Sequence, residues 1–149
     1  RHPDYPGMSE HDCLVENIDI TSTILDCAGL DPVDALGRSW PGHQNTVPAR
    51  SLIPVLSGES TKHREFAYSE SYGIWEMIEF PDYKYVAHLP SSAQSDSKES
   101  LWALASDPNE EDDVSREPSS EAILNRARQL RMDIHDTFLP CQTRWTVFQ

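Results

Sequence analysis

The strongest constraint on the fold is an amphipathic pattern of helical period near the C-terminus. Ser119 or Ser120 can cap a helix here, and Glu121 suits the positive end of its dipole. The apolar residues recur every three or four positions and form one stripe: Ile123, Ala127, Leu130, Ile134 and Phe138. A helix of this length needs a partner for its apolar stripe, so the preceding sequence must supply a layer on which it packs.

Four short strand candidates precede this helix. They are rich in aromatic and branched residues and cover 66–69, 75–80, 84–88 and 101–104. The dipeptide Pro81-Asp82 predicts a tight turn and makes the second and third candidates a hairpin. The serine-rich segment 90–100 predicts a loop. We therefore expect an α+β fold in which the long C-terminal helix packs on a four-stranded antiparallel sheet.

A helix-and-loop segment comes before the sheet. A short helix is predicted at about 19–28, where Asp19 can accept hydrogen bonds from the free backbone N–H groups at its start and Gly29 suits the left-handed position after its end. Ile20 and Ile24 lie on its apolar face. A loop follows, and a single helical turn is predicted over 51–56.

The composition excludes several classes of partner. Twenty-five acidic and 12 basic residues give a net charge of −13, which argues against nucleic acid and anionic lipid. No apolar stretch is long enough to span a membrane. The acidic run 109–113 lacks the central glycine of a calcium-binding loop and is expected to be a solvated loop. The three cysteines leave the compartment, and hence the localisation, undecided.

The residues that could carry chemistry are few. The six histidines show no metal-ligand spacing, and no nucleophile-elbow or phosphate-loop motif is present. Tyr72 and Trp75 follow the first strand candidate and could stack on a sugar or an aromatic ring, or could simply cover the sheet. His88 ends the third strand candidate.

Five segments, taken in order, resemble the C-terminal third of a sulfatase, a member of the alkaline phosphatase superfamily of hydrolases. Asp19 to Gly29 is similar to that family's Asp-x-x-Pro-Thr-Leu-Leu-x-x-Ala-Gly element, with Ser22 where the proline usually stands. Residues 101–113 are similar to its Leu-Tyr-Asp-Leu-x-x-Asp-Pro-x-Glu-x-x-Asn element. Segments 51–58, 64–70 and 83–86 lie between them in the expected order.

The resemblance implies that this chain is one part of a longer parent protein. Residues 1–60 would be the end of an α/β catalytic domain, and 61–149 a C-terminal subdomain. The parent would hydrolyse sulfate esters with a formylglycine and a divalent metal ion, calcium. The Cys/Ser-x-Pro-x-Arg motif that yields formylglycine does not occur in this chain, so we assign it no catalytic residue and no metal ligand.

The implied partners are the missing N-terminal catalytic domain and, through the parent, a sulfated small molecule or glycan. In this family, strand ends approach the substrate cleft, so Tyr72, Trp75 and His88 are the expected cleft contacts. Two other functions stay open from the sequence. One is a phosphodiesterase or phosphonate hydrolase of the same superfamily, and the other is an interaction module without chemistry. The start at Arg1 suggests that the chain is part of a longer protein.

Overall fold

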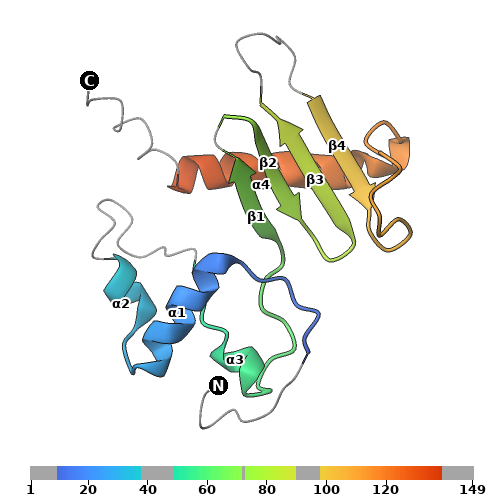
Figure 1. Cartoon of the computed structure of the whole chain (residues 1–149). Coiled ribbons are helices and arrows are strands. Elements are labelled where there is room, and N and C mark those ends of the chain that lie inside the picture. The colour runs from blue at the N-terminus through green and yellow to red at the C-terminus, as the bar shows by residue number, and fades with distance from the viewer. Residues whose placement is uncertain (1–9, 38–48, 72, 90–97, 139–149) are drawn as a thin grey trace, which may run out of the picture. The chain divides into compact units, whose positions relative to one another are not determined.

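The chain folds into two compact units, Arg1–Ala67 and Tyr68–Gln149. The computed structural model describes residues 10–37, 49–71, 73–89 and 98–138 (Figure 1). Among these residues, the first unit contains three helices, and the second contains a four-stranded antiparallel sheet with a long helix. The predicted α+β class is therefore confirmed.

The first helix of the first unit, α1, spans Asn17–Cys27 and begins two residues earlier than predicted. Glu16 is its N-cap and forms a capping box with Asp19, whose Oδ2 accepts a hydrogen bond from the Glu16 N–H at 2.9 Å. Asp19 is therefore the third residue of the helix and not the first, but its carboxylate accepts from a free backbone N–H at the helix start, as predicted. The capping box was not recognised because a glutamate, rather than a serine or threonine, occupies the cap position.

The predicted end of this helix is confirmed. Gly29 has a φ of +73°, and the N–H groups of Gly29 and Leu30 donate to the carbonyls of Asp26 and Leu25 at 2.9 and 3.0 Å. This is a Schellman motif, which requires the left-handed conformation at Gly29. The described part of the unit also contains two short helices, α2 at Pro32–Gly37 and α3 at Ile53–Leu56. The second of these lies within the predicted turn at 51–56.

In the first unit, polar side chains of α1 are buried and apolar ones are exposed, which is the reverse of the pattern in a self-sufficient domain. The fully buried side chains of α1 are polar, Asp19 and Ser22, and Val55 of α3 is buried with them. Ile20 and Ile24 are 55% and 63% exposed. Other large apolar side chains are exposed as well: Val15, Ile18, Leu30, Val33 and Leu56. The unit thus presents much apolar surface that burial would stabilise.

The sheet of the second unit is a meander with the strand order β1-β2-β3-β4. Its strands are β1 (Ala67–Ser71), β2 (Trp75–Glu79), β3 (Tyr83–His88) and β4 (Lys98–Ala103). Strand β4 begins three residues earlier than predicted, so Lys98, Glu99 and Ser100 belong to the sheet and not to the preceding loop. Their polar character hid this part of the strand from the sequence pattern.

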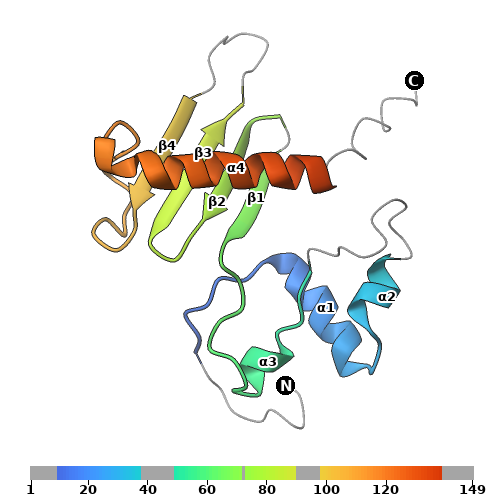
Figure 2. The same ribbon diagram turned by 180° about the vertical axis from the view of Figure 1, so that it is seen from behind.

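One face of the sheet is covered by α4, Glu121–Phe138, which follows a turn of 3-10 helix at Pro118–Ser120 (Figures 1 and 2). The core of this layer is a cross-strand row of Ile78, Tyr85 and Leu101, each 0% exposed. No helix in the described part of the chain is long and apolar enough to cross a membrane.

The helix turns a slightly different stripe to the sheet than predicted. Ala127 and Ile134 are buried as expected, but Ile123 and Leu130 are half-buried, and Leu124 is buried instead. The rotation has a physical cause, because the stripe that meets the sheet includes Arg131, which pairs with a buried glutamate of β2. A pattern read from apolar residues alone does not register an arginine on the inner face.

Candidate functional site

The buried carboxylate of Asp19 joins several segments of the first unit through hydrogen bonds. Its Oδ1 accepts a hydrogen bond from the Arg50 N–H at 2.8 Å, and its Oδ2 accepts one from Arg64 Nε at 2.8 Å. A second guanidinium nitrogen of Arg64 donates to Oδ1, and Nε2 of His63 lies 3.0 Å from Oδ2. With the capping bond from Glu16, every oxygen of this carboxylate is engaged.

These hydrogen bonds keep the Asp19 carboxyl in its ionised form. Burial raises the pKa of this carboxyl, but the bonds from Arg64 and from the Glu16 and Arg50 amides outweigh burial and hold it well below its usual range. A carboxylate committed in this way is a structural anchor for the segments at residues 50 and 63–64. It is not available as a base or as a metal ligand.

Two further polar side chains of α1, Thr23 and Ser22, differ in the hydrogen bonds that their hydroxyls make. The Thr23 hydroxyl donates to the carbonyl of Asp19 at 2.6 Å and accepts from the Leu52 N–H at 2.9 Å, which fixes the start of α3. Ser22 is 1% exposed, and its hydroxyl has no hydrogen-bond partner within the described residues. In the sulfatase element that residues 19–29 resemble, the position of Ser22 is usually a proline, which has no polar side chain.

The second unit holds its own buried charge between the sheet and α4. Glu76 of β2 is 3% exposed and pairs with Arg131, and its Oε1 lies 2.5 Å from His135 Nε2. On β4, Glu99 accepts from Arg128 of α4 at 2.6 Å and from the Tyr85 hydroxyl at 2.7 Å. These contacts fasten the helix to the sheet.

Register places two of the three predicted cleft residues side by side. Trp75 of β2 pairs with His88 of β3, and His88 pairs in turn with Lys98 of β4. Directly paired residues project from the same face of a sheet, so the three side chains form one line, which we call the Trp–His–Lys row. The third predicted residue, Tyr72, lies outside the described residues. Lys98 was missed because it was assigned to the loop before β4.

The Trp–His–Lys row lies on the face of the sheet opposite α4. Glu76, the residue after Trp75, contacts α4, and successive side chains of a strand point to opposite faces. Trp75 is half-buried, whereas His88 and Lys98 are exposed. Neither His88 nor Lys98 makes a side-chain hydrogen bond or ion pair with another described residue.

Charge is divided unequally between the two faces. Glu76 and Glu99 point toward α4. On β1, Glu70 accepts from the Tyr68 hydroxyl at 2.8 Å. Burial raises the pKa of that hydroxyl, and the bond to Glu70 adds to this. Among the described residues of β2, β3 and β4, the face opposite α4 carries Glu79 as its one carboxylate, together with Lys84, His88 and Lys98.

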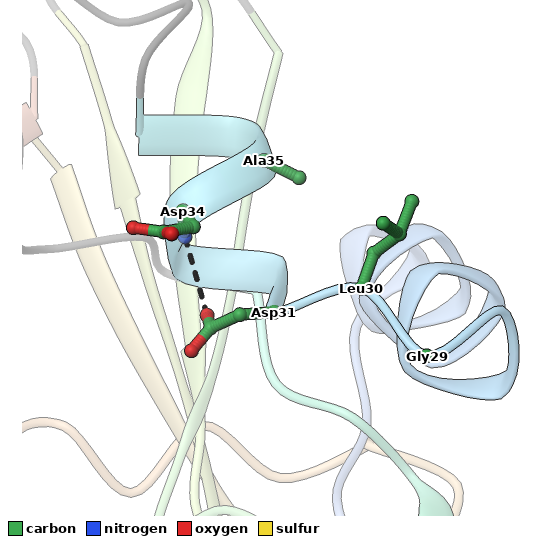
Figure 3. Close-up of a pocket in the computed structure, with 5 residues that line it drawn as sticks. All are labelled: Gly29, Leu30, Asp31, Asp34 and Ala35. Carbon is green, nitrogen blue, oxygen red and sulfur yellow. Dashed lines mark hydrogen bonds between the residues drawn. The ribbon is translucent and has the colours of Figure 1, made fainter.

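The remaining candidates do not form a catalytic centre. A pocket of about 380 Å³ lies where α1 meets α2, lined by Gly29, Leu30, Asp31, Asp34 and Ala35 (Figure 3). The Asp31 carboxylate there caps α2, since its Oδ1 accepts from the N–H groups of Val33 and Asp34 at 2.7 and 3.2 Å. This pocket is therefore the product of a tight interhelical turn.

The acidic run after β4 is a hydrogen-bonded loop. Asp113 accepts from the N–H groups of Leu101 and Ser115 at 3.1 and 2.9 Å, and Glu110 pairs with Lys84 at 2.8 Å. Within the described residues, no three His, Cys, Asp or Glu side chains are placed to hold a metal ion. Cys13 and Cys27 are free thiols.

Comparison with known proteins identifies the class of fold. No protein-family model matches the chain, and no curated protein does. Solved structures do match, and they define a sulfatase-like fold.

Three of these structures illustrate the match. A 2-O GAG sulfatase is 25% identical, with a TM-score of 0.55, over 79% of this chain and 24% of its own. A Bacteroides thetaiotaomicron protein described as a sulfatase is 25% identical, with a TM-score of 0.54 and the same coverage of 79% and 24%. A structure in complex with its substrate D-glucosamine-2-N,6-O-disulfate shares the fold at 19% identity and a TM-score of 0.56. The chain thus spans about a quarter of the length of the sulfatases that it matches.

Proposed function

We propose that this chain is the C-terminal portion of a sulfatase-family hydrolase of the alkaline phosphatase superfamily, and that the parent protein hydrolyses sulfate esters. One observation carries the proposal. The fold matches that of a 2-O GAG sulfatase, at 25% sequence identity, over 79% of this chain and only 24% of that enzyme.

The burial pattern of the first unit supports the same conclusion. Its α1 buries an aspartate and a serine while Ile20 and Ile24 stay exposed. Such a helix gains stability when another layer covers its apolar side, at about 25 cal/mol per Å² of apolar surface. We assign residues 1–60 to the end of the catalytic domain, whose remaining part would cover this side, and residues 61–149 to the C-terminal subdomain.

The chemistry would reside in the rest of the parent. A calcium ion needs six or more oxygen ligands, and the buried carboxylates of this chain do not fit that requirement. Asp19 is committed to Arg64 and backbone N–H groups, and Glu76 is committed to Arg131 and His135. The metal ligands and the formylglycine nucleophile would therefore come from the N-terminal catalytic domain. Tyr72, Trp75 and His88 would contribute to the rim of the substrate cleft.

The test begins with the coding sequence upstream of Arg1. We expect a Cys/Ser-x-Pro-x-Arg motif there, and calcium-dependent hydrolysis of an aryl sulfate by the purified full-length protein. Substitution of the motif's Cys or Ser by alanine should abolish this activity, which is the matched control. A parent that lacks the motif and cleaves aryl phosphonates or phosphate diesters instead would identify the other branch of the superfamily and overturn the proposal.

A further inference from the structure

We propose that the Trp–His–Lys row is a binding subsite for one sugar ring that carries an anionic group. Trp75 would stack on the ring, and His88 and Lys98 would bind the anionic substituent. The proposal deepens the proposed function and rests on it for the class of substrate. The geometry and charge of the sheet carry it further, because they bring in Lys98, which no sequence pattern had connected with Trp75.

The dimensions of the row suit a single sugar. Directly paired residues on neighbouring strands have Cβ atoms about 4.5–5.5 Å apart, so the row of three spans roughly 10 Å. An indole presents a broad apolar surface that matches the C–H face of a pyranose. An exposed ammonium and an imidazole at the other end can donate charge-assisted hydrogen bonds to a sulfate or a carboxylate.

The charge around the row favours an anion despite the net charge of −13. The adjacent cross-strand row on the same face consists of Met77, Val86 and Ser100 and contains no carboxylate. The one carboxylate that β2, β3 and β4 place on this face, Glu79, lies one row further away, opposite Lys84 in the register. The Asp113 carboxylate reaches the Ser100 side chain of the adjacent row, but it is engaged by the N–H groups of Leu101 and Ser115. Because Glu76 and Glu99 point toward α4, β2, β3 and β4 place no carboxylate in the row of Lys98 on this face.

Lys84 provides an internal control. It lies on the same face as Lys98, two rows away, and its ammonium is already paired with Glu110 at 2.8 Å. Substituting either lysine by glutamine changes the net charge by the same amount. Only the loss of Lys98 should therefore affect binding strongly.

The experiment measures equilibrium binding to the 149-residue chain and needs no turnover. The probes are a disaccharide bearing N-acetylglucosamine 6-sulfate, its desulfated form, and a disaccharide bearing glucuronate. Calorimetry gives affinities, and NMR shift mapping reports on the Trp75 indole N–H and the His88 ring. Circular dichroism confirms that each variant is folded.

We expect the sulfated disaccharide to bind at least fivefold more tightly than the desulfated form, with shifts at Trp75 and His88. Lys98→Gln and Trp75→Ala should each weaken binding about fivefold or more, and Lys84→Gln less than twofold. Comparable binding of the glucuronate probe would show that the subsite binds carboxylates as well as sulfates. Absence of binding by the folded chain, or equal losses for Lys98→Gln and Lys84→Gln, would overturn the proposal. Because no catalysis is measured, a parent that proves not to be a sulfatase would leave these results interpretable.

Discussion

Replacing Asp19 with asparagine tests the central anchor of the first unit. The carboxylate is 0% exposed and accepts hydrogen bonds from Arg64 and from the Glu16 and Arg50 amides. Asparagine retains one acceptor oxygen, but its amide nitrogen would face donors, and the Arg64 guanidinium, whose side chain is 6% exposed, would lose its counter-charge. Removing one partner of a buried ion pair costs about 3–5 kcal/mol, so we expect a loss of that size in the free energy of unfolding.

Urea titration and amide hydrogen exchange of α1 would measure this loss. Asp12→Asn makes the same chemical change at an exposed position and should alter stability by less than about 0.5 kcal/mol. Equal, small effects of the two substitutions would refute the role of Asp19 as an anchor. So would exchange in α1 that the Asp19 variant leaves unchanged.

The same anchor predicts a dependence on pH. The pKa of Asp19 is lowered in the folded state from its ordinary value of 3.8, so the unfolded chain binds the proton more readily. The stabilisation is therefore complete above that ordinary value and is lost as the pH falls below it. Stability measured from pH 6 down to pH 2 should fall less steeply in Asp19→Asn than in the parent chain. Parallel curves would contradict the assignment.

Three further predictions follow from the burial pattern and the comparisons. Ser22→Ala removes a buried hydroxyl without a partner in the described chain and should raise the free energy of unfolding by about 1 kcal/mol; a lower urea midpoint would show that the hydroxyl is satisfied. Leu124→Ala should cost about 2–5 kcal/mol and Ile123→Ala clearly less, since only Leu124 is buried; thermal unfolding that ranks them in the opposite order would place the wrong stripe of α4 on the sheet. The isolated chain should not hydrolyse an aryl sulfate, and metal-dependent turnover abolished by changing a residue named here would show otherwise.

The helices, strands and turns could be predicted from the sequence because they depend on the spacing of apolar residues and on local turn signals. The stripe at Ala127 and Ile134 and the turn at Pro81-Asp82 express local preferences that a single segment carries. Gly29 belongs to the same group, since a left-handed position after a helix favours glycine wherever the helix lies.

Features that depend on pairing between distant segments were not predicted. Glu76 looks like a surface residue of a strand until Arg131, 55 positions later, is placed above it. Lys98 looks like part of a polar loop until β3 supplies His88 as its neighbour. Asp19 resembles a helix cap by its position, although its partners lie at residues 50, 63 and 64. Buried charge requires a counter-charge in space, and that partner cannot be read from local pattern.

The separation between Asp19 and its partners also bears on how the chain folds. The contacts run over 31, 44 and 45 residues, so two large loops must close before the carboxylate is neutralised. In contrast, the paired residues of the β2–β3 hairpin are at most 13 positions apart, the separation of Trp75 and His88. Contacts over long separations form slowly, and a charged group resists leaving water until its partner arrives. During synthesis α1 would therefore remain uncommitted until Arg64, 45 residues after Asp19, has emerged from the ribosome.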